Sequence, residues 1–136
     1  MSQHDSARAA VFSAGSWGTA VAKVLADAGT SVIVHARRSE IADAINTHHR
    51  NPGYFPDHEL PAALTATTDP AAALDGADFL VLSIPAQTLR TNLAAWARHI
   101  GPDTVIVSLM KGIEQSSHLR PSQIITDVTG VSADRV

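Results

Sequence analysis

The sequence predicts an α/β fold in which a doubly wound parallel sheet is covered by helices on both faces. Apolar strand-like runs alternate with helix-like stretches along the chain, and four of the five runs show little polar alternation. Runs of this kind are typical of strands buried on both faces, and each crossover between parallel strands must return over one face of the sheet. These observations favour a Rossmann-type domain.

The predicted strands and helices follow one another in order. The strands are expected at residues 9–12, 31–34, 64–67, 79–84 and 104–109. The first helix carries its apolar residues over 20–28 and ends at Gly29; the second is capped by Ser39 and carries Ile41 and Ile45; the third begins at Asp69 and Pro70 and ends near Gly76; the fourth follows Pro85 and places Leu89, Leu93, Trp96 and Ile100 on one stripe; the fifth begins around Pro121 and ends before Gly130.

Composition excludes several classes of function. The 136 residues carry a net charge of -3, so the chain lacks the basic surplus typical of proteins that bind nucleic acid or anionic membranes. With no cysteine there is neither a disulfide framework nor a thiolate metal site, which fits a cytoplasmic protein. The start MSQHDSAR does not resemble a signal peptide. His48, His49 and His58 share one stretch, but adjacent histidines rarely face one ion, so no metal site is expected.

The stretch VFSAGSWGTA, residues 11–20, runs from the first strand into the first helix through a turn of small residues. Gly15 and Gly18 occupy the second and third positions of a G-x-G-x-x-G turn, and Ser13 stands at the first. In such a turn the second glycine lets the backbone approach a pyrophosphate, and the third lets the helix pack on the strand. The helix start then offers N–H groups to the phosphates. The alternative is that small residues merely ease the turn.

The end of the second strand indicates which dinucleotide is preferred. Sites for NAD usually place an acidic residue there to bind the ribose diol, but this chain has Arg37 and Arg38, with no acid before Glu40. Two guanidinium groups suit a 2'-phosphate, so the sequence favours NADP(H), with NAD(H) possible. A solvated arginine pair at a helix start is the alternative. The segment 48–61 is the longest irregular one, and it is either a functional loop or a packed surface loop.

Several motifs together resemble one family. They are AGSWGTA at 14–20, HARR at 35–38, NPGYFPDHELP at 51–61, ATTD at 66–69, IPAQ at 84–87 and SLMKGIE at 108–114. The chain resembles the N-terminal dinucleotide-binding domain of the bacterial NAD(P)-dependent glycerol-3-phosphate dehydrogenases over nearly its whole length. The family usually has glycine where this chain has Ser13.

The resemblance implies a reversible hydride transfer between sn-glycerol 3-phosphate and the nicotinamide ring, giving dihydroxyacetone phosphate. It implies that the backbone at Ser16 and Trp17 contacts the cofactor, that Arg37 or Arg38 meets the adenosine phosphate, and that Tyr54 lies nearby. Lys111 matches a lysine between cofactor and substrate, where an ammonium at the carboxyl edge of the sheet can oppose charge on the substrate oxygen. Taken alone, an exposed lysine before a glycine is more often a simple solvated side chain.

Family members also carry a helical domain that supplies the general base and the groups that grip the substrate phosphate. We therefore expect residues 1–136 to form an NAD(P)-binding domain that is incomplete at its C-terminal end, and to bind cofactor better than they turn over substrate. The resemblance further implies a cytoplasmic role in supplying glycerophospholipid precursors, and a homodimer or association with a helical domain. A catalytically silent dinucleotide-binding module is the alternative.

Overall fold

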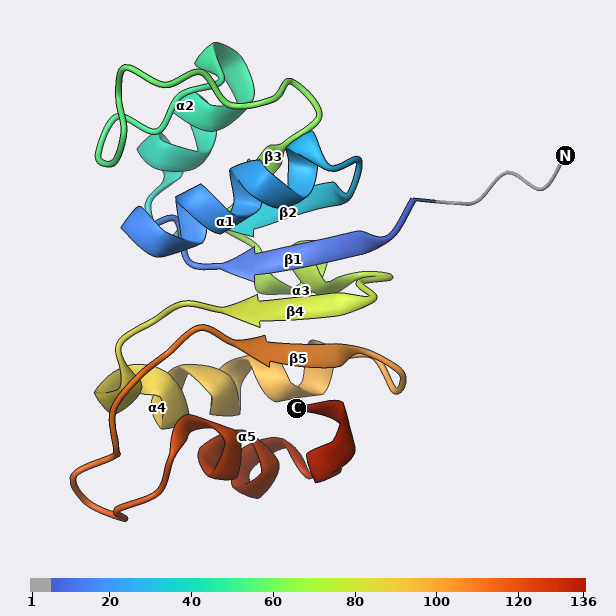
Figure 1. The fold of residues 1–136 in the computed structure, drawn as a ribbon, viewed down its shortest axis with the longest axis vertical. Coiled ribbons are helices and arrows are strands. Elements are labelled where there is room, and N and C mark those ends of the chain that lie inside the picture. Colours follow the sequence, from blue (N-terminus) through green and yellow to red (C-terminus); the bar gives the residue numbers. More distant parts are fainter. Residues whose placement is uncertain (1–5) are drawn as a thin grey trace, which may run out of the picture.

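The structure, a computed structural model, describes residues 6–136 and contains five parallel strands with helices between them (Figure 1). The first five residues of the polar start discussed above lie outside the described range. The elements are β1 (Arg8–Phe12), α1 (Ser16–Asp27), β2 (Ser31–His35), α2 (Ser39–His48), β3 (Thr65–Thr67), α3 (Pro70–Leu74), β4 (Phe79–Leu82), α4 (Ala86–Trp96), β5 (Val105–Ser108) and α5 (Pro121–Thr129), with 3-10 turns at Ala97–His99 and Ala133–Arg135.

The strand order across the sheet is β3-β2-β1-β4-β5. The chain builds outward from β1 in one direction through β2 and β3, then returns to the other side of β1 with β4 and continues to β5. All five strands end at the same edge, which lies at the left of Figure 1. The strand order reverses between β1 and β4, and in open sheets of this kind the crevice at such a reversal is where ligands bind.

Each face of the sheet has its own hydrophobic core, because successive side chains of a strand point to opposite faces. Helices α1 and α2 cover one face and bury residues such as Val11, Val34 and Ile45. Helices α3, α4 and α5 cover the other face, where Leu82, Leu93 and related residues are fully buried. The doubly wound parallel sheet predicted from the sequence is thus confirmed.

Several predicted boundaries differ from the structure. Strand β4 ends at Leu82, two residues early, because the chain leaves the sheet before Pro85 to begin α4. Helix α4 ends at Trp96 and tightens into the 3-10 turn Ala97–His99, so Ile100 lies beyond the helix although it packs on the same core. Ser39 was expected to cap α2, but it is the first helical residue, and the cap position is held by Arg38 without a side-chain hydrogen bond.

Other helix ends agree with the sequence. Asp69 caps α3 by accepting a hydrogen bond from the Ala71 N–H at 2.9 Å, and Gly130 ends α5 in the left-handed conformation. Trp96 and the leucines that share its stripe on α4 are buried core residues, as expected. Within residues 6–136, no helix has both the length and the apolar character that crossing a bilayer requires.

Candidate functional site

A pocket of about 340 Å³ opens at the carboxyl edge of the sheet, where the strand order reverses. Three connections that are distant in sequence form its wall: the turn after β1, the link between β4 and α4, and the loop after β5. The lining residues are Gly15, Ser16, Trp17, Ser83, Ile84, Pro85, Ala86, Leu109, Met110 and Lys111. The fold therefore gathers Gly15, Ser16, Trp17 and Lys111, all of which were predicted as site residues.

The turn after β1 leaves the start of α1 open to an anion. Gly15 is the cap residue, with an extended backbone (φ -82°), and within the described residues no side chain caps the helix. The first turn also contains no acidic residue. The N–H groups at this end and the positive end of the helix dipole are thus uncompensated by the protein, which is the arrangement that binds phosphate groups.

Gly18 has a different role from Gly15, because it lies within the helix and not on the pocket wall. A Cβ at Gly18 would overlap the carbonyl oxygen of Ser13, whereas a Cβ at Gly15 would meet only the Ser13 hydroxyl, at 3.5 Å. The third glycine of the turn is thus required for close packing of α1 against the end of β1. This agrees with the packing role expected from the spacing, and Gly18 has no direct place in the pocket.

Ser13, which stands where glycine was expected, fits its position. Among residues 6–136 the left-handed region holds three non-glycine residues, His49, Phe55 and His118, so Ser13 does not need glycine's freedom at φ. Its hydroxyl donates a hydrogen bond to the Ser83 carbonyl at 3.1 Å. The hydroxyl thus joins the ends of β1 and β4.

Asn51 anchors the loop after α2 to the turn after β1, and sequence reasoning did not single it out. The side chain is 1% exposed, and its amide donates hydrogen bonds to the Ala14 carbonyl and the Thr19 hydroxyl, both at 2.9 Å. Its oxygen accepts a hydrogen bond from the Gly53 N–H at 3.0 Å. A buried asparagine whose amide is satisfied in this way fixes the path of both segments. The one available signal was an asparagine preceding proline in an irregular stretch.

Arg37, Arg38 and Tyr54 lie outside the pocket wall. The two arginines follow β2, the strand next to β1, and both are exposed at the same edge of the sheet. Arg38 lies 3.7 Å from the Glu40 carboxylate with both side chains largely in solvent, and no ion pair of Arg37 occurs in residues 6–136. Tyr54 is 46% exposed, in the loop that Asn51 anchors. These side chains are available to a ligand that extends from the pocket past β1.

His35 supports the backbone that carries the arginines. The imidazole stacks on Phe12 with ring centroids 4.5 Å apart, and its Nε2 donates to the Thr68 carbonyl at 3.2 Å. Burial lowers the pKa of His35, and the hydrogen bond to Thr68 and the nearby Asp69 only partly oppose that effect. The imidazole is therefore neutral at pH 7, and it packs against Phe12 at the end of β2 as an uncharged side chain.

Lys111 lies on the pocket wall in the loop after β5. Its side chain is exposed and has no ion pair with any residue of the described chain. The next residue, Gly112, has a φ of +104°, a conformation that side-chain-bearing residues rarely adopt, so the chain turns sharply here.

The link Ser83–Ala86 also lines the pocket but was not predicted as part of the site, although it directly follows a strand adjacent to β1.

The histidines in the described part of the chain are not gathered into a metal site. Within residues 6–136 no group of three histidine, aspartate or glutamate side chains is placed to hold an ion. His48 ends α2, His49 follows it in the left-handed conformation, and His58 stacks edge-on against Phe55.

Comparison with known proteins gives consistent matches. Residues 8–136 match the family model described as the NAD-dependent glycerol-3-phosphate dehydrogenase N-terminus. The chain is 58% identical over 127 residues to glycerol-3-phosphate dehydrogenase [NAD(P)+] of Corynebacterium urealyticum, covering 93% of this chain and 38% of the relative. It is 57% identical over 129 residues to the protein of the same name from Streptomyces avermitilis, covering 95% of this chain and 38% of the relative.

Solved structures agree with the sequence matches. The crystal structure of glycerol-3-phosphate dehydrogenase from Coxiella burnetii superposes with a TM-score of 0.84 at 28% identity, over 93% of this chain and 38% of that one. The yeast glycerol-3-phosphate dehydrogenase superposes with a TM-score of 0.81 at 26% identity, over 93% of this chain and 40% of that one. The chain therefore belongs to the NAD-dependent glycerol-3-phosphate dehydrogenase family, and it spans 38% of the length of its bacterial relatives named here.

Proposed function

We propose that residues 1–136 form an NAD(P)-binding domain whose pocket holds the dinucleotide in a glycerol-3-phosphate dehydrogenase. One observation carries the proposal: the pocket lies where the strand order reverses, and the uncapped start of α1 faces it. The backbone at Gly15, Ser16 and Trp17 would hold the pyrophosphate. When bound, the nicotinamide ring supplies the hydride acceptor or donor, which no side chain can provide.

Lys111 is proposed to act on the substrate side of the pocket. Its ammonium would donate a hydrogen bond to the C2 oxygen of sn-glycerol 3-phosphate or dihydroxyacetone phosphate, and would stabilise the negative charge that develops there. The absence of an ion pair within the described residues supports this role, because an already paired ammonium would have less charge to offer.

Substrate turnover needs groups beyond those proposed for this chain. The relatives are named for action on glycerol 3-phosphate, and the part of them that this chain does not match is proposed to supply the general base and the groups that bind the substrate phosphate. A homodimer or contact with such a helical domain, and a cytoplasmic role in providing glycerophospholipid precursors, are included in the proposal because the family resemblance implies them.

We further propose a preference for NADP(H). Arg37 and Arg38 are exposed at the end of β2, where the adenosine ribose of a dinucleotide bound across β1 would lie. Charge-assisted hydrogen bonds to a 2'-phosphate would be stronger than those to a ribose hydroxyl. The long 3.7 Å contact between Arg38 and Glu40 is exposed and weak, so it leaves this guanidinium free to rearrange toward a phosphate.

Calorimetric titration of NADPH and NADH tests both parts of the proposal. Replacing Arg37 and Arg38 with Ala should weaken NADPH binding by about 1.5 to 3 kcal/mol more than NADH binding, if each contact to the 2'-phosphate forms. Gly15→Val should abolish detectable binding of both, since a branched side chain would fill the space of the phosphate. Ala72→Val on the exposed side of α3 is the matched control. Equal losses for the two cofactors would contradict the proposed preference.

A further inference from the structure

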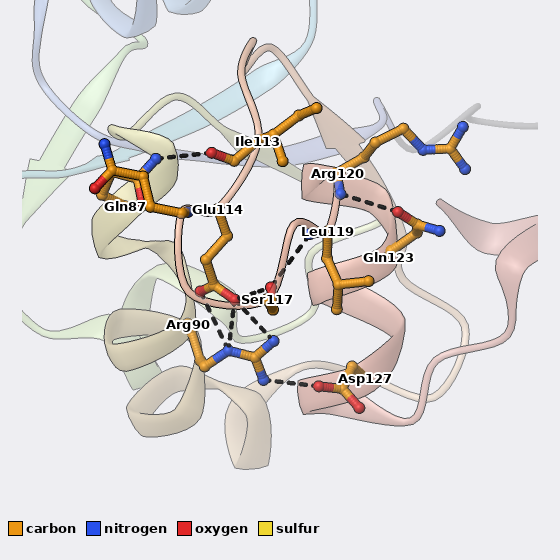
Figure 2. Close-up of polar contacts among 10 residues, drawn as sticks. Gln87, Arg90, Ile113, Glu114, Ser117, Leu119, Arg120, Gln123 and Asp127 are labelled. Atoms are coloured by element: carbon orange, nitrogen blue, oxygen red, sulfur yellow. Dashed lines mark hydrogen bonds and ion pairs between the residues drawn. The ribbon is translucent and has the colours of Figure 1, made fainter.

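We propose that Glu114 is a positioning residue, which, with Gln87 and Arg90 of α4, holds the loop after β5 so that Lys111 stays on the pocket wall. The inference rests on the proposed function, because Lys111 has its role only there. Figure 2 shows the arrangement: Arg90 lies between Glu114 of the loop and Asp127 of α5, while Gln87 reaches Ile113.

Glu114 is an unusual residue to find buried. It is 5% exposed and is the one acidic side chain in the buried class among residues 6–136. Burying a carboxylate is costly unless charged and hydrogen-bonded partners satisfy it. Here Arg90 supplies them. Its Nε lies 3.1 and 3.2 Å from the two carboxylate oxygens, and its Nη2 forms an ion pair with Oε1 at 3.1 Å. The Ser117 hydroxyl also donates to Glu114.

The hydrogen bond from Ser117 is the largest cause of a pKa of Glu114 below its ordinary value, and Arg90 lowers it further while burial opposes both. Glu114 is therefore a carboxylate at neutral pH. The backbone closes around it as well, since the Glu114 N–H donates to the Leu119 carbonyl at 2.9 Å and the His118 N–H donates to the Glu114 carbonyl at 2.8 Å. Residues 114–119 thus form a compact turn built on one charged side chain.

Gln87 fixes the residues on either side of Glu114. Its side-chain nitrogen donates to the Ile113 carbonyl at 2.9 Å, and its oxygen accepts from the Gln115 N–H at 3.0 Å. Three consecutive loop residues are therefore held by the first two turns of α4. Because two bonds at one glutamine resist rotation as well as translation, this contact orients the loop and does not merely attach it.

The same end of α4 forms the pocket wall. Pro85 and Ala86 line the pocket, and a Cβ at Gly112 would lie 3.8 Å from that of Ala86. Lys111 is three residues before Glu114, and the sharp turn at Gly112 connects them. The start of α4 thus both lines the pocket and contacts the loop that carries Lys111. A buried charge that served only general stability would not need to lie in this loop, close to Lys111.

Asp127 provides a matched control. It contacts the same guanidinium at 2.7 Å, but its side chain is 57% exposed and lies on α5, outside the loop after β5 that carries Lys111, which we call the lysine loop. Glu114→Gln and Asp127→Asn each replace a carboxylate that pairs with Arg90 by its isosteric amide. If the Arg90 contacts merely stabilise the fold, both variants should lower the overall stability and should differ only in how much they lower it. If Glu114 positions Lys111, only Glu114→Gln should alter the loop.

Hydrogen exchange and NMR of the full chain decide between these outcomes. Glu114→Gln should raise amide exchange at residues 109–115 by about tenfold and shift the Lys111 side-chain resonances, while Asp127→Asn changes both by less than about twofold. Gln87→Ala removes the two flanking hydrogen bonds without leaving an unpaired charge, and it should give the same local pattern if Glu114→Gln fails to fold. Equal effects of Glu114→Gln and Asp127→Asn, or unchanged exchange at 109–115 in Gln87→Ala, would overturn the inference.

These measurements need no cofactor, so they separate the inference from the proposed function. A wild-type chain that binds no NADPH would contradict the proposed function alone. If the wild-type chain does bind NADPH, the Glu114→Gln variant should keep the same NADPH contacts at Gly15–Trp17. The loop after β5 and the turn after β1 are held by different side chains.

Discussion

Two segments that line the same pocket are held in place by different physical means. The turn after β1, residues 13–18, is fixed by uncharged contacts: the close packing of Gly18 on the Ser13 carbonyl, the Ser13 hydroxyl on Ser83, and the Asn51 amide on Ala14. The loop after β5, residues 109–120, is fixed by the buried carboxylate of Glu114 and the groups around it.

The difference follows from what each segment must leave free. The turn presents backbone N–H groups at the positive end of α1, and an acidic side chain nearby would compete with phosphate for them. The lysine loop presents a cation, and its carboxylate is already paired with Arg90, so it does not neutralise Lys111. Neutral contacts near the proposed phosphate site and a separate ionic network near Lys111 leave both the helix start and the lysine charge available.

The largest expected effect comes from Gly18. Gly18→Ala places a Cβ against a backbone oxygen, and backbone cannot move aside as a side chain can, so unfolding free energy should fall by about 3 kcal/mol. Gly112→Ala makes only an ordinary van der Waals contact with Ala86, at 3.8 Å, and suffers mainly from its positive φ, which should cost about 1 kcal/mol. Urea unfolding of the two variants measures both values. A loss at Gly112 equal to or larger than that at Gly18 would contradict the close packing described for the turn.

Asn51 is expected to have the next largest effect. Asn51→Ala removes two donated hydrogen bonds and leaves the half-buried Ala14 carbonyl and the buried Thr19 hydroxyl without that partner, so stability should fall by about 1 to 3 kcal/mol. Asn92→Ala, which removes one exposed hydrogen bond to Thr88, is the control and should cost less than about 0.5 kcal/mol. Amide exchange should rise in the turn and in the loop after α2 together in Asn51→Ala. A rise confined to the loop would show that Asn51 does not support the turn.

The smallest expected effects are those of acidic pH on stability. They should distinguish His35, at the end of β2, from Glu114, in the loop after β5. Burial lowers the pKa of His35 below its ordinary value of 6.5, so the unfolded chain takes up the proton more readily, and stability should decline as pH falls below about 6.5. Glu114 has a pKa below its ordinary value of 4.5, so its contribution is complete above that pH and is lost as pH falls through the folded value.

Thermal unfolding measured against pH checks both signs. His35→Phe keeps an aromatic ring against Phe12 but cannot titrate, so its stability should be flat where the wild-type curve first declines. The protection of amides 109–115, measured relative to the intrinsic exchange rate at each pH, should be lost only as pH falls below 4.5 and through the lowered pKa of Glu114. Loss of the loop's protection already near pH 6 would mean that the ionic network is not what holds it.

The sequence was sufficient for the sheet and for the glycine turn, because each depends on local pattern: apolar runs and glycine spacing. Lys111 was singled out by the family resemblance and not by such a pattern. The sequence was not sufficient for the contacts that hold those parts together. Ser13 and Ser83 are 70 residues apart, Asn51 and Ala14 are 37 apart, and Arg90 and Glu114 are 24 apart. No periodicity links such pairs, so only the folded chain reveals them.

The boundaries that were misjudged have a similar cause. Ile84 lies two residues past the end of β4 and extends the apolar pattern, but pairing with β5 stops at Leu82, and Ser83–Ala86 line the pocket instead. In the same way, Ile100 continues the apolar stripe of α4 after the helix has tightened into a 3-10 turn. Hydrophobic pattern records which side chains are buried, and hydrogen bonding decides where an element ends.

We propose that one pocket, assembled from the three connections after β1, β4 and β5, binds the dinucleotide. An NMR titration of the labelled chain with NADPH tests it most directly. We expect shifts at residues 15–17, 83–86 and 109–111, with a further set at 37–38 that NADH reproduces less strongly. A second pocket of about 500 Å³ beside α5, with Arg120, Gln123 and Thr126 in its wall, serves as the internal comparison. Shifts confined to that second pocket, or none at the turn after β1, would contradict the account.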